Sequence, residues 1–389
     1  MSMLYLDNAA TTPVRPEVLD AMMPFLTRWF GNPSSHHTVG EAAADALGEA
    51  RARVARDLGM RAGDVIFTSG GTEANNLAVK GIVIAAAARS TGASEVRARH
   101  LVTTPIEHES ILESADYLAR VHGFDLTHVA VDGFGRVAPA DVAAALRDET
   151  ALVTVGYANN EVGTVQDVAA IAGAARERGI PVHIDAVQAA GWLPLNAADL
   201  GVDAISLAGH KLGAPKGTGV LALRGRVPLE PLLHGGGQER GRRSGTEDVA
   251  GAVGFATALE LAEAERADAS ARVTAIRDRF IARVLAGVPS AALTGDPVHR
   301  LPGTASFTFA GTSGEAVLLE LERRGVVSSS GSACAAGSDE PSHVLLAMGV
   351  APEVAQTAVR FTFPHALDQP LDAVADAVSA SVTAVQSSG

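Results

Sequence analysis

Short apolar runs alternate along this chain with longer Ala-rich segments, and this alternation limits the possible folds more than any other feature. The apolar runs, which we expect to be strands, are Val65–Thr68, His100–Thr104, Ala151–Tyr157, Val182–Asp185, Ala204–Leu207 and Gly219–Leu223. Segments of helical character lie between several of them, namely 71–87, 109–121 and 168–178. Alternating strands and helices are typical of a mostly parallel sheet with helices on both faces. Because the runs are apolar throughout, each strand is expected to be covered on both sides.

The pattern changes near residue 262. A single long helical segment, rich in Ala, Glu and Arg, is predicted from Leu259 to Leu285. Beyond it the expected elements are more widely spaced: a strand at Ala305–Phe309, a helix at Glu315–Arg324, a Ser/Gly loop and a strand at Val359–Phe363. The sequence therefore predicts a second, smaller α+β domain that is reached over a connecting helix.

Composition argues against several classes of protein. The 389 residues are enough for two or three domains, and no apolar run reaches the ~20 residues of a membrane span. A formal net charge of −13 argues against a nucleic-acid-binding surface. The one cysteine rules out an intramolecular disulfide and a multi-cysteine metal site, and the 12 histidines show no metal-binding spacing. The N-terminus lacks the basic and apolar regions of a secretory signal, so we expect a cytoplasmic protein.

Polar residues at the ends of the predicted strands are the first candidates for chemistry, because ligands of open α/β sheets bind there. The segment Thr68–Glu73 has two glycines at the start of a predicted helix, which suits a phosphate. Asp185 ends one predicted strand, and Lys211 follows the next one. A carboxylate there could face a protonated ring nitrogen, and a lysine could form a Schiff base. Taken alone, each feature has an ordinary explanation: a glycine turn, a helix cap and a surface lysine.

Cys334 is a further candidate. It lies in the run Ser328–Gly337, which consists almost entirely of small residues and offers no bulky apolar partner. A structural cysteine is usually packed in a core, whereas a cysteine in a loop of small residues is better suited to reactivity.

Taken in order, these and other motifs resemble the cysteine desulfurases of the class V, fold type I group of aminotransferases, which depend on pyridoxal 5'-phosphate (PLP), along almost the whole chain. The matching segments are Tyr5–Pro13, Gly31–Ser35, Phe67–Glu73, Glu107–His108, Asn159–Gly163, Asp185–Gln188, Gly209–Lys211, His234–Arg240, Arg243–Thr246, Ser329–Cys334 and Arg360–Phe361. Any one of them is a weak signal, but their joint order and spacing is highly specific.

The resemblance implies a fold and a division of the chain. The expected large domain, residues 16–262, binds PLP on a mostly parallel seven-stranded sheet. The expected small α+β domain combines residues 1–15 with residues 263–389 and carries the catalytic cysteine loop at about 325–340. The setting of the cysteine resembles the subgroup that supplies iron–sulfur clusters or thio-cofactors.

The resemblance also implies roles around the PLP ring. Lys211 forms the internal aldimine and moves protons at the substrate Cα. Asp185 pairs with the pyridine nitrogen, and Gln188 hydrogen-bonds the ring hydroxyl. His108 stacks on the ring and acts as an acid/base group.

The phosphate of PLP is expected to be held by Gly71, Thr72 and His210. Thr246 is expected to reach it from the other subunit of a homodimer. One departure from the family is Ala208, which stands where relatives often have a serine, so one phosphate-binding hydroxyl is missing.

The remaining implied roles concern the substrate. Asn160, which also belongs to the cofactor site, and Arg360 bind its carboxylate, and Cys334 accepts the sulfur. The expected reaction converts L-cysteine into L-alanine and a persulfide on Cys334, for delivery to a sulfur-acceptor protein in iron–sulfur cluster assembly, thio-cofactor synthesis or tRNA thiolation. The alternatives are a selenocysteine lyase, another class V enzyme such as a transaminase, and a non-catalytic sulfur-relay scaffold.

Overall fold

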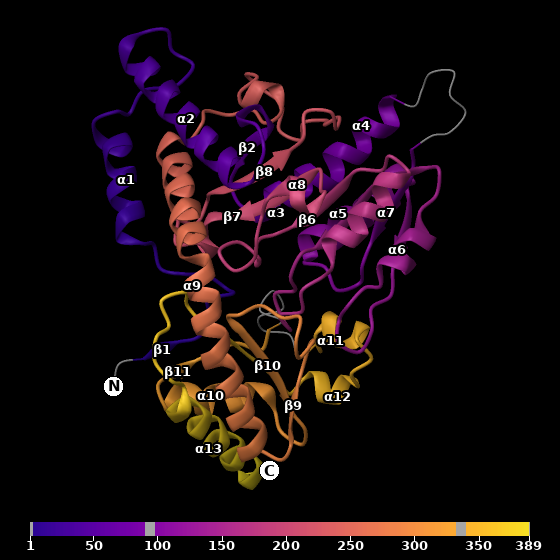
Figure 1. Ribbon diagram of the computed structural model, residues 1–389, viewed down its shortest axis with the longest axis vertical. Helices are drawn as coiled ribbons and strands as arrows, with labels where there is room; N and C mark the ends of the chain where they lie inside the picture. The colour runs from indigo at the N-terminus through magenta and orange to yellow at the C-terminus, as the bar shows by residue number, and fades with distance from the viewer. Residues whose placement is uncertain (1–2, 90–97, 332–339, 389) are drawn as a thin grey trace.

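The computed structural model of the chain describes residues 3–89, 98–331 and 340–388. Within these ranges the largest sheet has seven strands (Figure 1). In spatial order they are β2 (Val65–Thr68), β8 (Gly219–Leu223), β7 (Ala204–Ala208), β6 (Val182–Asp185), β5 (Thr150–Gly156), β3 (His100–Thr103) and β4 (Asp125–His128). β8 runs antiparallel to both of its neighbours, and the other pairs are parallel. The predicted α/β fold with a mostly parallel seven-stranded sheet is confirmed.

Strand β4 is the one strand of this sheet that has no counterpart among the predicted runs. It lies at the edge of the sheet and pairs with β3 alone within the described part of the chain, and its residues are exposed or half-exposed. An edge strand needs no apolar run, and charged or polar residues there discourage pairing with another chain. The signal that located the other six strands is therefore missing from Asp125–His128.

Helices cover both faces of the sheet, because successive strand residues point to opposite sides. Val153 of β5 packs into the buried cluster on one face and Leu152 into the cluster on the other. The face of Val153 carries α1 (Pro16–Thr27), α2 (Thr38–Asp57), α6 (Pro139–Ala145), α7 (Val168–Glu177), α8 (Ala197–Leu200) and the first part of α9 (Val249–Gly287). The opposite face carries α5 (Glu109–His122) and one continuous helix made of α3 (Gly71–Asn76), the π-helical turn η2 (Leu77–Gly81) and α4 (Ile82–Arg89).

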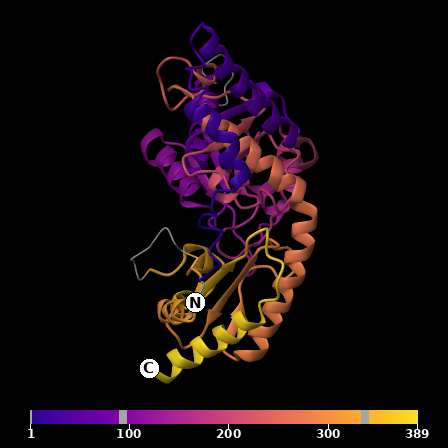
Figure 2. The same cartoon turned by 90° about the vertical axis from the view of Figure 1, so that its left-hand side faces the viewer.

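Helix α9 runs from the sheet along the C-terminal part of the chain (Figure 2). It begins at Val249, so the predicted start at Leu259 was wrong. Asp248 caps it, with Oδ1 accepting from the Gly251 N–H at 2.8 Å. The first turns, up to Ala258, are buried on nearly every side. They therefore lack the one-sided apolar pattern by which a helix is identified in a sequence.

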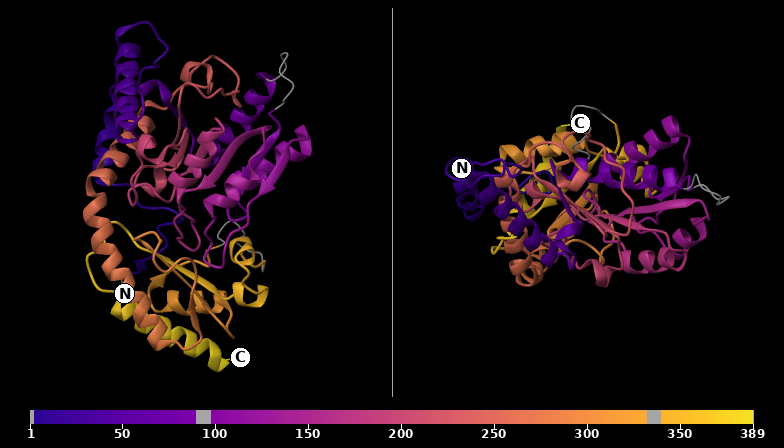
Figure 3. Two further views of the ribbon diagram at one scale, coloured as in Figure 1. Left: turned by 45° about the vertical axis from the view of Figure 1, so that its right-hand side comes forward. Right: turned by 90° about the horizontal axis from the view of Figure 1, so that it is seen from above.

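A second buried core lies in the C-terminal part of the chain and includes Leu6 from the N-terminus. The left-hand view of Figure 3 shows this part of the chain below the large sheet. It is built on the antiparallel sheet β12-β10-β9 and the parallel pair β1-β11. The bounds are β1 (Leu4–Tyr5), β9 (Ala291–Leu293), β10 (Thr304–Phe309), β11 (Val326–Val327), β12 (Ala358–Thr362), α10 (Gly314–Arg323), α11 (His343–Ala347), α12 (Pro352–Ala355) and α13 (Asp372–Ser388). Phe280 of α9 packs edge-to-face on Phe361, with ring centroids 5.2 Å apart. Separate cores are compatible with the expected division near residue 262, which stays a prediction.

Candidate active site

A cavity of about 290 Å³ lies beyond the carboxyl ends of three adjacent strands, where an open α/β sheet binds its ligands. Gly156 ends β5, Asp185 ends β6 and Ala208 ends β7, and all three line the cavity. The predicted site residues that line it are Gly71, Thr72, His108, Asn160, Asp185, Gln188, His210, Lys211 and Arg360. The fold therefore gathers most of the residues singled out in the sequence into one place.

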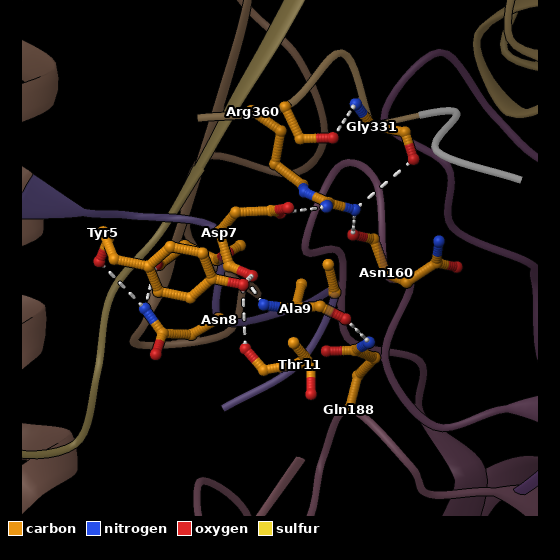
Figure 4. Close-up of polar contacts among 12 residues, drawn as sticks. Tyr5, Asp7, Asn8, Ala9, Thr11, Asn160, Gln188, Gly331 and Arg360 are labelled. Carbon is orange, nitrogen blue, oxygen red and sulfur yellow. Dashed lines mark hydrogen bonds and ion pairs between the residues drawn. The ribbon is translucent and has the colours of Figure 1, made fainter. Parts of the chain in front are cut away.

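The N-terminal segment forms the wall of the cavity that holds Lys211. This lysine follows β7 through the short 3₁₀ turn η3 (Gly209–Lys211). Its Nζ donates to the carbonyl oxygens of Ala9 and Ala10, the latter at 2.7 Å. Gln188 Nε2 donates to the same Ala9 carbonyl at 3.1 Å (Figure 4). The sequence matched this segment to the family without giving it a role, and the structure shows that its carbonyl groups orient the amine.

Asp185 is held by two donors. Its Oδ1 accepts from the Val187 N–H at 2.9 Å, and its Oδ2 accepts from Asn75 Nδ2 at 2.7 Å. Asn75 comes from α3 and is 1% exposed. Hydrogen bonds of this kind fix the position of a carboxylate, which suits a group that faces a protonated ring nitrogen. Sequence reasoning missed Asn75, whose only signal was its place four residues after Gly71 in the helix that follows the glycine loop.

The helix that starts at Gly71 places its N-terminus at the cavity. Its first backbone N–H groups have no intrahelical acceptor and attract an anion. Glycine is required at two positions here: Gly70 has φ of 151°, and a Cβ on Gly71 would lie 2.9 Å from Val187 Cγ2. The carboxylate in this first turn, Glu73, is already paired with Arg243 at 2.8 Å. This end of the helix is therefore open to a phosphate.

His210 contributes a neutral imidazole to the cavity. Burial, followed by the charges of Lys211 and Lys216, lowers the pKa of His210 to about 4. Its Nδ1 lies 3.2 Å from Thr11 Oγ1. A neutral imidazole still carries one N–H, so it can donate a hydrogen bond to a phosphate oxygen.

Two neighbouring residues at the start of α5 have contrasting environments. His108 caps the helix, and its Nδ1 accepts from the Ser110 N–H at 3.0 Å. Burial raises the pKa of Glu107 to about 8, with Asp185 adding to the shift and a hydrogen bond from the Thr104 hydroxyl at 2.6 Å opposing it. Glu107 therefore keeps its proton at neutral pH and adds no second negative charge beside Asp185. The sequence gave a role to His108 and none to Glu107.

Arg360 lies on β12 with its side chain 2% exposed. Its Nη2 pairs with Asp7 Oδ1 at 2.6 Å, and its Nη1 donates to the Asn160 carbonyl at 2.8 Å (Figure 4). The Nε atom is buried and has no partner among the described residues. An unsatisfied buried donor costs about 1–3 kcal/mol, so an incoming carboxylate is favoured at this position. Asp7, which neutralises the guanidinium, was not foreseen.

Two of the predicted residues are not seen in the cavity. Thr246 lines a separate hollow together with Arg243. Cys334 lies outside the described residues. Gly331, three positions earlier in the chain, does line the cavity, and its carbonyl oxygen is 3.4 Å from Arg360 Nη1.

Neither a membrane span nor a metal cluster is found in the described ranges. No helix there is long and apolar enough to cross a bilayer. No group of three or more His, Cys, Asp or Glu side chains in these ranges is arranged to hold a metal ion.

The donor set of the cavity fits PLP. A lysine amine, a fixed carboxylate and a helix N-terminus beside a neutral imidazole share one enclosure. These groups match the aldehyde, the ring nitrogen and the phosphate of PLP, respectively. A Cβ at position 71 would collide with Val187, so this position requires glycine. Glycine has no side chain and lets the backbone approach a phosphate closely.

The fold and this site together define a PLP-dependent enzyme of fold type I. The chain belongs to the aminotransferase class-V family, whose sequence profile matches residues 4–369. Within that family it is similar to the cysteine desulfurase IscS of Dictyoglomus turgidum, with 44% identity over 92% of this chain and 89% of that protein.

Solved structures agree with this assignment. A NifS-like protein superposes with a TM-score of 0.86 at 34% identity, covering 99% of this chain and 98% of that one. The structure of SspA in complex with cysteine gives a TM-score of 0.80 at 35% identity, covering 92% of this chain and 98% of that one. The family, the fold and the cofactor inferred from the sequence are thereby confirmed.

Proposed function

We propose that this protein is a cysteine desulfurase that takes the sulfur atom of L-cysteine onto Cys334 and releases L-alanine. The observation that carries the proposal is that Lys211, Asp185 and Arg360 line one cavity. An amine for PLP, a carboxylate for its ring nitrogen and a buried guanidinium for an amino-acid carboxylate are the groups this substrate needs. The similarity to IscS and to a protein solved in complex with cysteine supports the choice of substrate.

The side chains around the cavity bind and orient the substrate. Bound PLP supplies an electron sink that stabilises negative charge at the α-carbon of an amino acid. Arg360 and the Asn160 side chain hold the substrate carboxylate, and a planar guanidinium fixes its angle. Lys211 is placed to move the proton of the α-carbon, because the carbonyls of Ala9 and Ala10 keep its Nζ inside the cavity.

Sulfur transfer requires a thiolate, and Cys334 is the one cysteine of the chain. Its sulfur forms a bond to the substrate sulfur while the carbon–sulfur bond breaks. The electron pair of the broken bond stays on the three-carbon fragment, which takes up a proton and leaves as alanine, so no oxidant is needed. Gly331, the last described residue before Cys334 in the sequence, lines the cavity.

The outer side of α1 supports a homodimer. Leu19, Met23 and Leu26, at i, i+4 and i+7, are 49%, 44% and 56% exposed, while Val18 and Met22 of the same helix are buried. A contiguous exposed apolar stripe is typical of a surface that another chain covers. In the proposed dimer a second copy covers this stripe and Thr246 reaches the phosphate site of the partner. Sedimentation should show a dimer that Met23→Glu weakens, and an active native monomer would contradict this.

We further propose that the persulfide passes to an acceptor protein in the cytoplasm, for iron–sulfur cluster assembly, thio-cofactor synthesis or tRNA thiolation. Covalent capture of the persulfidated chain together with a thiol-bearing protein tests this step. Selenocysteine lyase remains the alternative activity, and turnover of both substrates by the native chain and by Cys334→Ser separates the two. Retention of selenocysteine turnover in Cys334→Ser, together with no reaction of the native chain with L-cysteine, would favour that alternative.

Intact-protein mass spectrometry tests the proposed reaction. After incubation with L-cysteine in the absence of a reductant, the native chain should gain ~32 Da per sulfur atom, removable by a thiol. Cys334→Ser should bind PLP as the native chain does but gain no sulfur, because a serine hydroxyl is a poor nucleophile toward sulfur. If the variant still forms alanine at the native rate, Cys334 is not the acceptor and direct elimination must be considered.

A further inference from the structure

Asp185, Asn75, Ser110 and His108 form a continuous hydrogen-bonded chain along the cavity, which all four line. Asn75 Nδ2 lies 2.7 Å from Asp185 Oδ2 and 2.9 Å from Ser110 Oγ. Ser110 Oγ lies 2.8 Å from His108 Nδ1, and the Ser110 backbone N–H donates to the same nitrogen at 3.0 Å. Asn75 and Ser110 are buried, with 1% and 7% of their surface exposed.

The direction of each hydrogen bond in this chain follows from the carboxylate at its end. Because Asp185 can only accept, the atom of Asn75 that faces it must be the amide nitrogen. The second hydrogen of that nitrogen points to Ser110 Oγ, which accepts it and turns its own hydrogen toward His108 Nδ1. Since Nδ1 accepts from both the hydroxyl and the backbone, a neutral His108 imidazole carries its hydrogen on Nε2.

A buried atom shows that the amide keeps this orientation even at some energetic cost. Asn75 Oδ1 is buried without a partner in the described part of the chain. An unsatisfied buried acceptor costs about 1–3 kcal/mol. Turning the amide over would place Oδ1 against the Asp185 carboxylate, which is worse, so the orientation is fixed by the carboxylate.

We propose that Asn75 and Ser110 are positioning residues that fix His108 as a proton donor at Nε2 toward the bound substrate. The inference rests on the proposed function and sharpens it, because the sequence implied only an acid/base group at His108. One carboxylate thereby has two tasks: it faces the ring nitrogen of PLP, and it sets the tautomer of His108 through two neutral side chains. His108 gives its proton from Nε2 and takes one back at the same atom.

The tautomer can be measured without turnover. Long-range proton–nitrogen NMR of the PLP-loaded chain, labelled with ¹⁵N-histidine, should show a His108 signal with Nε2 protonated and Nδ1 unprotonated; His108→Gln identifies the signal by its loss. Ser110→Ala and Asn75→Ala should both move the Nδ1 resonance. Ser114→Ala is the matched control, because it removes a hydroxyl of the same helix that donates only to the Ser110 carbonyl, at 2.6 Å. A His108 signal with Nδ1 protonated overturns the proposal.

Kinetics provide a second, independent measurement. Asn75→Ala and Ser110→Ala should lower kcat about 10- to 100-fold, less than the roughly 10²- to 10⁴-fold contribution of an acid/base group itself, with KM unchanged. Ser110→Thr keeps the hydroxyl and should recover most of the rate. His108→Gln, whose amide N–H lies near the position of Nε2, should be faster than His108→Asn, and the reverse order contradicts a donor at Nε2. If the native chain fails to act on L-cysteine at all, the proposed function fails while the NMR result still decides the tautomer.

Discussion

The two sides of the cavity are held together in different ways. On the side of the large sheet, Asp185 ends β6, Lys211 follows the neighbouring β7, and His108 caps a helix that packs on the same sheet. On the opposite side, Arg360 is paired with Asp7, 353 residues away in the sequence. The backbone positions of the sheet side are thus set by one sheet, whereas the pairing of Arg360 with Asp7 on the other side requires the two ends of the chain to meet. We expect the sheet side to determine cofactor chemistry and the opposite side to determine substrate binding.

The largest effect is expected on the sheet side, from the loss of Lys211. Lys211→Ala should abolish both alanine formation and the visible absorbance of covalently attached PLP, because the amine that forms the bond is gone. Absorbance spectra and alanine assays check this. Lys216→Ala, a lysine that does not line the cavity, is the control and should keep both signals. If Lys211→Ala retains both signals, Lys211 is not the amine that binds PLP.

Glu107 tests whether the sheet side depends on a neutral carboxyl group. The pKa of Glu107 is about 8 in the folded chain against an ordinary 4.5, so between those pH values only the unfolded chain releases the proton. Its contribution to the free energy of unfolding therefore falls as pH rises from 4.5 to 8 and is constant above. Glu107→Gln cannot ionise, so its stability relative to the native chain should rise between pH 5 and pH 8, on the order of a few kcal/mol.

Denaturant unfolding at the two pH values measures this shift. Glu109→Gln, an exposed glutamate two positions later, is the matched control and should show no such change. A difference between Glu107→Gln and native protein that is independent of pH would mean that Glu107 is ionised in the folded chain.

A substitution of Arg360 tests whether the opposite side of the cavity determines substrate binding. Arg360→Lys should raise KM for L-cysteine roughly 10- to 100-fold, because an ammonium group cannot hold a carboxylate in the bidentate geometry of a guanidinium. The absorbance of bound PLP should stay as in the native chain. Arg277→Lys is the control, since Arg277 is also buried but donates to the Leu301 carbonyl outside the cavity. Loss of PLP absorbance in Arg360→Lys would show that the two sides are not separable.

The smallest effect is expected at Ala208, where relatives often carry a serine. Ala208 ends β7 beside Gly71 and is 2% exposed. Ala208→Ser should tighten PLP binding about 3- to 10-fold, as one added hydrogen bond to a charged group implies. Ala204→Ser, at the buried start of the same strand, should not tighten it. Equilibrium dialysis of PLP measures both, and unchanged binding in Ala208→Ser would mean that other donors already satisfy the phosphate.

The sequence could predict those features of the fold and of the site that a local pattern of residues encodes. The strand ends at Asp185 and Lys211 follow apolar runs, so both their place at the sheet edge and their shared cavity could be inferred. The role of Asn75 depends on a contact with a residue 110 positions away, and that of Asp7 on one 353 positions away. No periodicity or spacing signals a partner at such distances. The same reason explains the edge strand β4, whose exposed residues carry no burial pattern.

The first strand of the chain, β1, can pair only after a much later segment has been synthesised. β1 pairs with β11, Leu4 lying opposite Val326, which is synthesised more than 300 residues later. At about 5–20 residues per second, the N-terminal strand is without its partner for on the order of 15 to 60 s of translation. The same N-terminal segment supplies the carbonyls of Ala9 and Ala10 that hold the Lys211 amine. All seven strands of the large sheet, the last of which ends at Leu223, are therefore synthesised before β1 can gain its partner.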